Sequence, residues 1–524
     1  MSEFDQPVQI RTAGISQPGL RRRIQESLFA SSATTFAGQG ANTIANLLLA
    51  AILGPADFGA ISIATLVITA FVITRNAFVF QTLIQRVDRV QDAADQMALL
   101  AIGLGGVLAI AIWLAAPAVS SFFHTPDSTG VLRLLGAGFL IESIGSVPAA
   151  LLEKELLFRR KLWLELAEPV LAAVVAVGLA LLGLGPSAVG WGQLIGNTVW
   201  TVGLYVIADY RPRPRRDLAL LRELVRYGRY VFAGSLMIFL FTNLDNASVA
   251  RLLGARALGY YAFAFLLAYF PANVFTRGIV ARVVLPVYAK LQFQPDAQAQ
   301  ALLTTLRYVG YYAALFCAGT ILLGPTVLNT LYGAKWAPAT TALQVLAVYA
   351  FAHSYFLVAQ RLCNGTGRAR AFWVIAVLQL AVVLPFLVLA PLRYGILGTS
   401  VLFTASKVIT TMVAIAVMVR FTGLSLWRLV SQIVRPLGLA LIAGLAALLA
   451  SVVVPDMRRW TLTALELAIF VVAYGSMCLL TDRPLLTEVS SFIGSYRRRR
   501  LTAVTDSGKG NEPDPSLREK EIGE

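Results

Sequence analysis

The sequence contains few charged residues, and this scarcity argues against a soluble protein. Only 14% of its 524 residues are Asp, Glu, Lys or Arg, whereas 57% are hydrophobic. Soluble domains carry about 25% charged residues. The composition therefore predicts a polytopic membrane protein and not a soluble enzyme held by one anchor.

Residues that usually perform catalysis or bind metals are also scarce. The chain has two histidines and three cysteines, and Cys317, Cys363 and Cys478 show no CxxC spacing. A disulfide framework or a metal cluster is therefore not expected. Zinc-protease, serine-hydrolase and Walker motifs are absent, and no loop is long enough to form an ATP-binding domain. We expect neither an enzyme nor a cofactor.

Long apolar runs are abundant, each of about 20 residues, which is enough to cross a hydrocarbon core of about 30 Å. The polar start of the sequence carries no recognisable cleavable signal peptide. The runs predict an all-α protein with fourteen membrane spans, at 28–53, 58–82, 97–118, 131–152, 163–184, 187–208, 230–253, 258–280, 305–328, 338–360, 371–391, 394–418, 433–454 and 460–480.

Basic residues gather on one side of these spans. Threading the spans through a bilayer leaves about five Lys or Arg on one side for each one on the other. The positive-inside rule places the basic side in the cytoplasm, so both termini are predicted there. The same rule accounts for the net charge of +16, and nucleic acid is not an expected partner.

The chain also repeats itself. AILGPADFGAISIATLV resembles RLLGARALGYYAFAFLL 200 residues later, which aligns Gly54 and Gly59 with Gly254 and Gly259. Spans 1–6 and 7–12 therefore look like two six-helix lobes. Their shared orientation predicts a pseudo-twofold axis along the membrane normal, with a binding site between the lobes.

These features divide the chain into six predicted parts. The basic linker contains apolar residues at helical spacing from Leu218 to Val225, which predict a helix lying on the membrane surface. The parts are a cytoplasmic N-terminal segment (1–27), an N-lobe (28–208), the linker (209–229), a C-lobe (230–418), two appended spans (433–480) and a basic tail predicted to be disordered (481–524).

Four basic residues lie within spans or near their inner ends: Arg75, Arg277, Arg282 and Lys407. A cation at the centre of a spanning helix costs roughly 2.5–3.5 kcal/mol, and such groups usually face a bundle interior or a water-filled cavity. We predict that these four line a central cavity and bind a phosphate-bearing ligand, because an arginine fork can engage two oxygens at once. Alternatively, the arginines snorkel to the inner surface and Lys407 forms a local ion pair.

Polar residues follow one face of the first span. The stretch GQGANTIAN places Gln39, Asn42 and Asn46 on a shared helix face. We predict that they line the cavity, although such a stripe also suits interhelical packing. Glu165 and Glu168 adjoin the basic FRRK segment and are interpreted as a solvated interface pair.

Two acidic residues lie deep in other spans. Asp245 belongs to the polar notch TNLDNAS, and Glu142 lies in the fourth span. Either could carry a coupled proton or cation, and Asn243 and Asn246 are predicted to line the cavity. The alternative for the notch is a cluster of hydrogen bonds between helices.

Several motifs, taken in order, resemble one family. NLDNASVARLLGARALGYYAFAFLL, QTLIQRVD, ELLFRRKLWLELAE, VVLPVYAKLQ and LYGAKWAPATTALQVLA are similar to oligosaccharide flippases of the polysaccharide-transport (Wzx-type) branch of the MOP exporter superfamily. The superfamily includes the multidrug MATE exporters and the lipid II flippase. The resemblance covers about residues 25–480.

The resemblance implies a MATE-like V shape with two extra helices. It also implies translocation of a polyprenyl-diphosphate-linked oligosaccharide across the inner membrane for cell-surface or exopolysaccharide synthesis, by alternating access. Arg75, Arg277 and Lys407 would engage the diphosphate, and Asp245 matches an acidic position of the seventh helix. Membrane lipids, a polysaccharide polymerase and assembly proteins are the implied partners.

Three other functions stay open at this point. The protein could be a cation-coupled multidrug or lipid II exporter, a membrane glycan polymerase or acyltransferase, or a scaffold that transports nothing. The tight outer connections GPAD and LGAR argue against an enzyme, and the charges inside spans argue against a scaffold.

Overall fold

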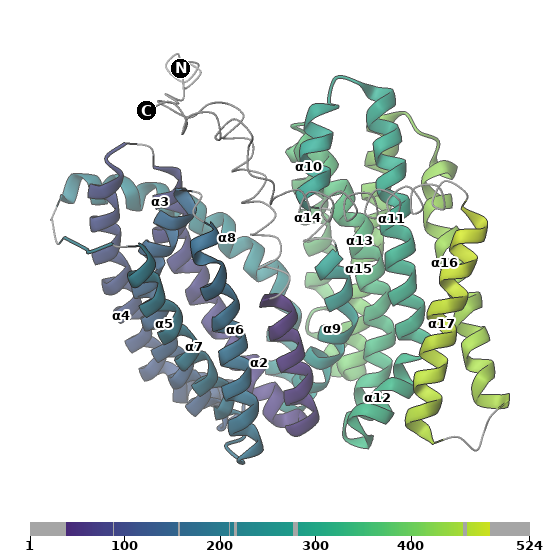
Figure 1. Ribbon diagram of the computed structural model, residues 1–524, viewed down its shortest axis with the longest axis horizontal. Coiled ribbons are helices and arrows are strands. Elements are labelled where there is room, and N and C mark those ends of the chain that lie inside the picture. Colours follow the sequence, from purple (N-terminus) through teal and green to yellow (C-terminus); the bar gives the residue numbers. More distant parts are fainter. Residues whose placement is uncertain are drawn as a thin grey trace, which may run out of the picture. The chain divides into compact units, whose positions relative to one another are not determined.

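The computed structural model is helical, and no strand occurs among the residues that it describes (Figure 1). These are residues 38–86, 88–155, 158–208, 210–213, 217–275, 281–453 and 458–482. The chain forms two compact units, Met1–Ile433 and Val434–Glu524. The predicted all-α membrane architecture is confirmed.

The first half of the larger unit begins with a helix at 38–52. The elements that follow are α2 (Pro55–Arg75), the π-helix η1 (Asn76–Phe80), α3 (Gln81–Gln85), α4 (Val90–Phe122), α5 (Ser128–Lys154), α6 (Phe158–Leu181) and α7 (Ser187–Ala208). α5 packs against both α4 and α7, and α6 packs against α7 (Figure 1). α2 starts where the Asp57 carboxylate accepts the backbone N–H of Gly54 at 3.1 Å, with Pro55 in the first turn.

The second half of the larger unit repeats this pattern with more breaks. Its elements are α8 (Leu218–Leu253), α9 (Ala255–Phe275), α10 (Ala281–Lys290), α11 (Pro295–Leu322), α12 (Gly324–Tyr332), the 3₁₀ helix η3 (Ala334–Ala339), α13 (Thr340–Gly365), α14 (Ala369–Val383), the 3₁₀ helix η4 (Leu384–Phe386) and α15 (Leu389–Thr422). α15 is interrupted at Gly395, which adopts a φ of 60°. The interruption lies where the eleventh and twelfth predicted spans join.

The final elements are α16 (Leu426–Val453) and α17 (Arg459–Thr481), and the boundary between the two units falls inside α16. Within the smaller unit, the guanidinium of Arg435 donates a hydrogen bond to the carbonyl of Thr481. This contact joins the two helices near one end.

Ten helices of the described residues are long and apolar enough to cross a membrane. The other four predicted spans, the first, sixth, eighth and eleventh, also coincide with helices: 38–52, α7, α9 and α14. A multi-span membrane protein is therefore established, whereas the number fourteen stays a prediction.

The repeated glycines mark where the two halves of the larger unit meet. A Cβ added to Gly59 would lie 1.8 Å from the carbonyl oxygen of Ala255, and one added to Gly259 would lie 1.8 Å from that of Pro55. The two contacts are equivalent, because Gly59 corresponds to Gly259 and Pro55 to Ala255 in the 200-residue repeat. α2 and α9 therefore cross backbone to backbone at equivalent positions, and only glycine fits there.

The chain also contacts itself between η3 and the end of helix 38–52. The Nζ of Lys335 donates to the carbonyls of Ala51 at 2.7 Å and Leu53 at 3.0 Å, and the indole Nε1 of Trp336 donates to that of Ala50 at 2.9 Å. These donors satisfy carbonyls that a helix C-terminus leaves unpaired. They join the second half of the unit to the first.

The linker residues predicted to form a surface-lying helix are helical, and their position on a membrane surface stays a prediction. Residues 218–229 form the first turns of the single long helix α8, with Leu220 and Leu224 buried in a cluster that includes Val79 and Leu83. Leu218, predicted on the apolar face, is 73% exposed. The apolar residues of this stretch pack against η1 and α3. The helix then continues into the seventh span without a breaking residue.

Candidate functional site

Arg75 lies at the junction between α2 and a π-helical turn. α2 continues directly into η1 and then α3, so one widened turn follows Arg75 within an otherwise continuous helix. Such turns are rare and frequently occur at functional sites. Arg75 is only 4% exposed. The arginine therefore does not snorkel to a surface.

The guanidinium of Arg75 is held on one side only. Its Nη2 donates to Oε1 of Glu142 on α5 at 2.8 Å and to Oδ1 of Asn76 at 2.9 Å, and Nε donates to the same Asn76 oxygen at 3.2 Å. The ring of Phe139 lies 5.6 Å away. Nη1 has no hydrogen-bond partner among the described residues. A guanidinium carries five N–H donors, so the two on Nη1, which are shielded from solvent in this conformation, have no acceptor among the described residues.

Glu142 serves as the counterion of Arg75. Its side chain is 28% exposed, against 5% for that of Arg75. Removing one partner of a buried pair leaves an uncompensated charge, which costs about 3–5 kcal/mol when both are deeply buried. Partial exposure of Glu142 lessens that cost. The predicted role of Glu142 in carrying a coupled proton stays a prediction.

Lys407 is buried in α15 and is 4% exposed. Its Nζ donates to Oε1 of Gln379 on α14 at 2.9 Å and lies 4.4 Å from the ring of Phe356 and 5.6 Å from that of Tyr349, both on α13. No salt bridge to Lys407 occurs within the described part of the chain, so the local ion pair considered above is not found there. A polarised amide and two aromatic faces compensate the charge instead.

An aromatic cluster adjoins this lysine. The hydroxyl of Tyr269 lies 3.0 Å from Nε2 of His353, and the ring of His353 stacks on Tyr349 with centroids 5.8 Å apart. This histidine therefore belongs to the packing of α9 against α13.

Asp245 on α8 is buried and is hydrogen-bonded to the neighbouring helix. Its Oδ2 accepts the hydroxyl of Tyr261 on α9 at 2.8 Å, and its Oδ1 accepts the backbone N–H of Asn246 at 2.8 Å. The nearby Asn243 donates to the carbonyl of Phe239 at 3.0 Å within its own helix. The notch thus bonds to other segments through Asp245 and through Ser248, whose hydroxyl donates to the carbonyl of Leu387 at 2.8 Å. Its predicted roles in coupling and cavity lining stay predictions.

Two predicted cations cannot be placed. Arg277 lies outside the described residues, and Arg282 falls within α10, where the side chain is not described. Their proposed contacts with a ligand stay predictions.

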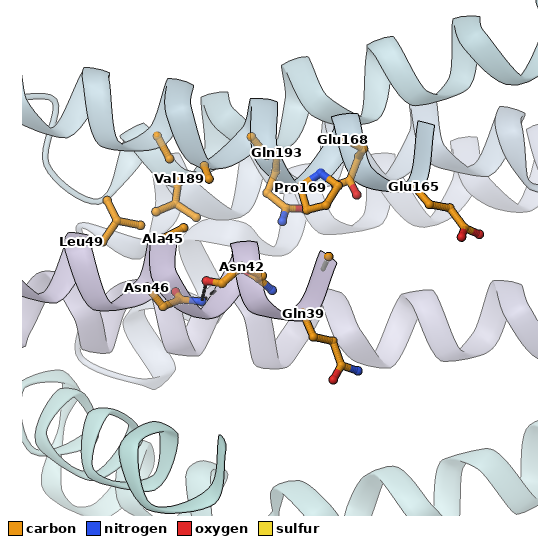
Figure 2. A pocket seen from close by; sticks show the side chains of 14 residues that line it. Gln39, Asn42, Ala45, Asn46, Leu49, Glu165, Glu168, Pro169, Val189 and Gln193 are labelled. Atoms are coloured by element: carbon orange, nitrogen blue, oxygen red, sulfur yellow. Dashed lines mark hydrogen bonds between the residues drawn. The ribbon is translucent and has the colours of Figure 1, made fainter. Parts of the chain in front are cut away.

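A polar pocket lies between helix 38–52, α6 and α7 (Figure 2). Its volume is about 360 Å³. Fourteen residues line it, and Figure 2 shows Asn42 and Asn46 on one helix across from Glu168 on another, with Gln39 pointing away from the glutamates. The polar residues that line the pocket are Gln39, Asn42, Asn46, Glu165, Glu168 and Gln193.

The two pocket carboxylates have different surroundings. Glu165 accepts a salt bridge from Lys161 at 2.8 Å, and Lys161 also lies 3.7 Å from Glu153. Glu168 makes no hydrogen bond or ion pair with the described residues, and its backbone carbonyl lies against Gly196 of α7. Both glutamates line the pocket, and Glu165 pairs with Lys161 of the FRRK segment, so the predicted solvated interface pair stays a prediction.

The sequence indicated the shared helix face of this pocket but not its other wall. Gln39, Asn42 and Asn46 all line the pocket, which lies within the first half of the larger unit, and their predicted place in a cavity between the lobes stays a prediction. Glu168 was assigned to the interface because of its basic neighbours, and Gln193 was not singled out. The one available signal for Gln193 was an amide within the apolar stretch WGQLIG.

Comparisons with known proteins agree with one another. The lipopolysaccharide biosynthesis protein WzxC of Escherichia coli is 26% identical over 73% of this chain and 78% of its own length. The succinoglycan biosynthesis transport protein ExoT of Rhizobium meliloti is 23% identical over 57% of this chain and 61% of its own. The teichuronic acid biosynthesis protein TuaB of Bacillus subtilis is 25% identical over 51% of this chain and 55% of its own.

Solved structures show the same fold. The lipid II flippase MurJ in an inward closed conformation superposes with a TM-score of 0.68 and 13% identity, covering 87% of this chain and 99% of MurJ. An inward-facing multidrug MATE transporter of the MOP superfamily gives 0.60 and 17% identity, covering 74% of this chain and 95% of that one. The profile of the family described as "Polysaccharide biosynthesis protein" matches residues 48–341, more than half of the chain. The chain thus belongs to the polysaccharide biosynthesis protein family, on a fold shared with MurJ and the MATE transporters.

Proposed function

We propose that this protein is a flippase that moves a polyprenyl-diphosphate-linked oligosaccharide across the inner membrane for cell-surface or exopolysaccharide synthesis. It is a membrane transporter and not an enzyme. Its family, the transport function named for ExoT and the fold shared with a lipid II flippase support this function.

The observation that carries the proposal is the half-coordinated guanidinium of Arg75. An unpaired ion in hydrocarbon costs tens of kcal/mol by Born estimates, so a diphosphate needs fixed positive groups along its path. Arg75 is anchored by Glu142 and Asn76 and keeps Nη1 free among the described residues. A phosphate oxygen bound there would gain charge-assisted hydrogen bonds. Lys407, with no carboxylate partner in the described part of the chain, is the second proposed phosphate ligand.

The proposed orientation supplies a driving force. With both termini in the cytoplasm, the substrate enters from the inner leaflet. An inside-negative potential then favours outward movement of the anion by about 2.3 kcal/mol per charge per 100 mV. The prenyl chain would stay in the lipid while the head group crosses. A polysaccharide polymerase and assembly proteins would act on the translocated glycan.

The test uses purified protein in vesicles and a lipid-linked oligosaccharide. The double variant Arg75→Gln, Glu142→Gln removes both charges and leaves none unpaired. Because hydrogen bonds to charged groups contribute about 1.5–3 kcal/mol, we expect translocation to slow roughly ten- to hundredfold. The measurement is the fraction of glycan that becomes accessible to an added glycosidase.

Arg133→Gln provides the matched control. Arg133 lies on α5, as Glu142 does, and packs over the ring of Trp113 at 4.6 Å, away from the Arg75 pair. This variant should translocate at the wild-type rate. A normal rate in the double variant would refute the assignment of Arg75.

The likeness to MurJ favours one rival, lipid II export, and the same assay separates the two. Lipid II and the proposed substrate share a prenyl diphosphate and differ in the sugar head. Faster movement of lipid II would favour the rival. Movement of a cationic drug but of neither lipid would favour a multidrug exporter, and an altered glycan mass would favour an enzyme.

A further inference from the structure

We propose that the pocket between helix 38–52, α6 and α7 binds the sugar residues next to the diphosphate. This inference rests on the proposed flippase function and identifies where the protein recognises the glycan. The pocket's volume of about 360 Å³ falls in the range of about 300–1,000 Å³ typical of small-molecule sites.

The chemistry of the lining suits hydroxyl groups and disfavours phosphate. The four amides, Gln39, Asn42, Asn46 and Gln193, each offer both donors and acceptors. A sugar hydroxyl likewise donates one hydrogen bond and accepts others. The described lining residues include two glutamates and no lysine or arginine; Glu165 is paired with Lys161, and Glu168, which has no partner in the described part of the chain, would repel a diphosphate.

The amides on helix 38–52 are available to a ligand. Asn46 donates only to Asn42 on the same helix, at 2.9 Å to its carbonyl and 3.2 Å to its side chain. Neither bond crosses to another helix. The polar residues of GQGANTIAN therefore do not hydrogen-bond to neighbouring helices, which was the alternative role considered for them.

Small residues make room for the pocket, and the tight contact between α6 and α7 forms its far wall. The pocket is walled by Ala45, Ala172, Ala173 and Ala176. Behind them α6 and α7 are in close contact, because a Cβ on Gly192 would lie 2.4 Å from the carbonyl of Ala172. The wall is thus a rigid surface, as a preformed site requires.

The pocket adjoins the proposed phosphate ligand. α7 packs against both sites. A Cβ on Gly196 would lie 3.1 Å from the carbonyl of Glu168. The hydroxyl of Thr201 donates to the carbonyl of Ile141 at 3.0 Å, next to Glu142, the partner of Arg75. A head group with its diphosphate at Arg75 can therefore extend its first sugars toward Glu168. The protein would then hold the two chemically different parts of one substrate at adjacent sites, the diphosphate at a guanidinium and the sugars at amides and carboxylates.

The test compares two ligands in detergent: the lipid-linked oligosaccharide and the same polyprenyl diphosphate without sugar. The variant Asn42→Ala, Gln193→Ala should weaken binding of the glycosylated lipid roughly tenfold, the loss expected for two hydrogen bonds. Binding of the bare diphosphate should not change. The double variant of Arg75 and Glu142 should weaken binding of both ligands.

Two further variants make the test decisive. Ala173→Leu fills the pocket without removing a polar group and should reproduce the selective loss. Thr198→Ala lies on α7 outside the pocket, where its hydroxyl bonds only to the carbonyl of Leu194, and should bind both ligands normally. Thermal unfolding of each variant identifies any that fails to fold. If the double alanine variant fails to fold, the binding of Ala173→Leu decides whether the pocket holds the sugars.

The outcomes separate this inference from the proposed function. If the wild type binds both lipids equally, or if pocket variants weaken both to the same degree, the sugar site is overturned while the flippase function stands. If the wild type binds neither lipid, both proposals fail.

Discussion

The two proposed phosphate ligands, Arg75 and Lys407, differ in how the surrounding side chains compensate their charge. Arg75 has a carboxylate partner and a side-chain amide, whereas Lys407 has one amide and two aromatic rings. A buried charge without a counterion is a cost to folding, and replacing such groups with apolar residues is often neutral or stabilising. Retention of an ammonium at this depth therefore points to a role in transport.

Replacing Lys407 with methionine separates the two effects. We expect Lys407→Met to unfold at the wild-type temperature or above, because the substitution removes an unpaired buried charge and preserves volume. Translocation should fall roughly tenfold or more if the ammonium binds phosphate. Thermal unfolding in detergent and the vesicle assay measure the two quantities.

Arg75→Met is the informative comparison. It leaves Glu142 without its partner, so this variant should lose both stability and transport. If Lys407→Met instead unfolds at a much lower temperature, Lys407 has a structural role and its assignment as a phosphate ligand is wrong.

At the residue scale, the sequence shows which side chains are unusual but not which ones meet. Arg75 and Glu142 each attract notice inside an apolar run, yet 67 residues separate them and no local pattern pairs them. Gln39, Asn42 and Asn46 were grouped correctly on one face because helical periodicity alone sets their relation. Glu168 joins them only through the packing of α6 against helix 38–52.

Among the helix–helix contacts at the described glycines, the crossing of α2 and α9 brings the two backbones closest together. Gly59 and Gly259 each place the opposite backbone where a side chain would begin. Interhelical contacts in membranes favour such small residues because van der Waals packing replaces the hydrophobic effect. The crossing thus fixes the geometry on which both halves of the larger unit depend.

Gly59→Ala should therefore destabilise the protein. Its Cβ would lie 1.8 Å from a backbone oxygen, and overpacking typically costs about 1–3 kcal/mol even when flexible side chains can yield. Gly103→Ala on α4 is the control, since a Cβ there meets nothing within 4 Å and alanine is the better helix former. Thermal unfolding should show a lower midpoint for the first variant and an unchanged or higher one for the second. Equal midpoints would contradict the close crossing.

The sequence anticipated this crossing better than it anticipated irregular elements. The repeated Gly54 and Gly59 pattern predicted two related halves, and the glycine contacts follow the repeat. The π-turn η1 has the sequence NAFVF, with no glycine or proline to signal it. The apolar spacing of the linker does not distinguish a helix on the membrane surface from a helix packed against its neighbours, because it suits both.

For the larger unit as a whole, transport by alternating access requires contacts between its two halves to break and re-form. The hydrogen bonds from η3 to the end of helix 38–52 are such contacts. Trp336 is fully buried, and it belongs to the same apolar cluster as Ala50 and Phe58. Opening at this end would expose that cluster and leave three helix-terminal carbonyls without their donors.

Weakening these bonds should favour the open state at this end. The double variant Lys335→Ala, Trp336→Phe removes the donors and keeps most of the packing volume. A reporter cysteine is placed at Ala50, which is 0% exposed. In the double variant this cysteine should react several-fold faster with a membrane-impermeant thiol reagent. A cysteine at Ala188, also 0% exposed but in a cluster confined to the first half, should keep its rate. Faster labelling at both positions would indicate general loosening, and no change at either would mean that these bonds do not hold the two halves together. Selective labelling at Ala50 would identify the η3 contact as the part of the molecule that opens during transport.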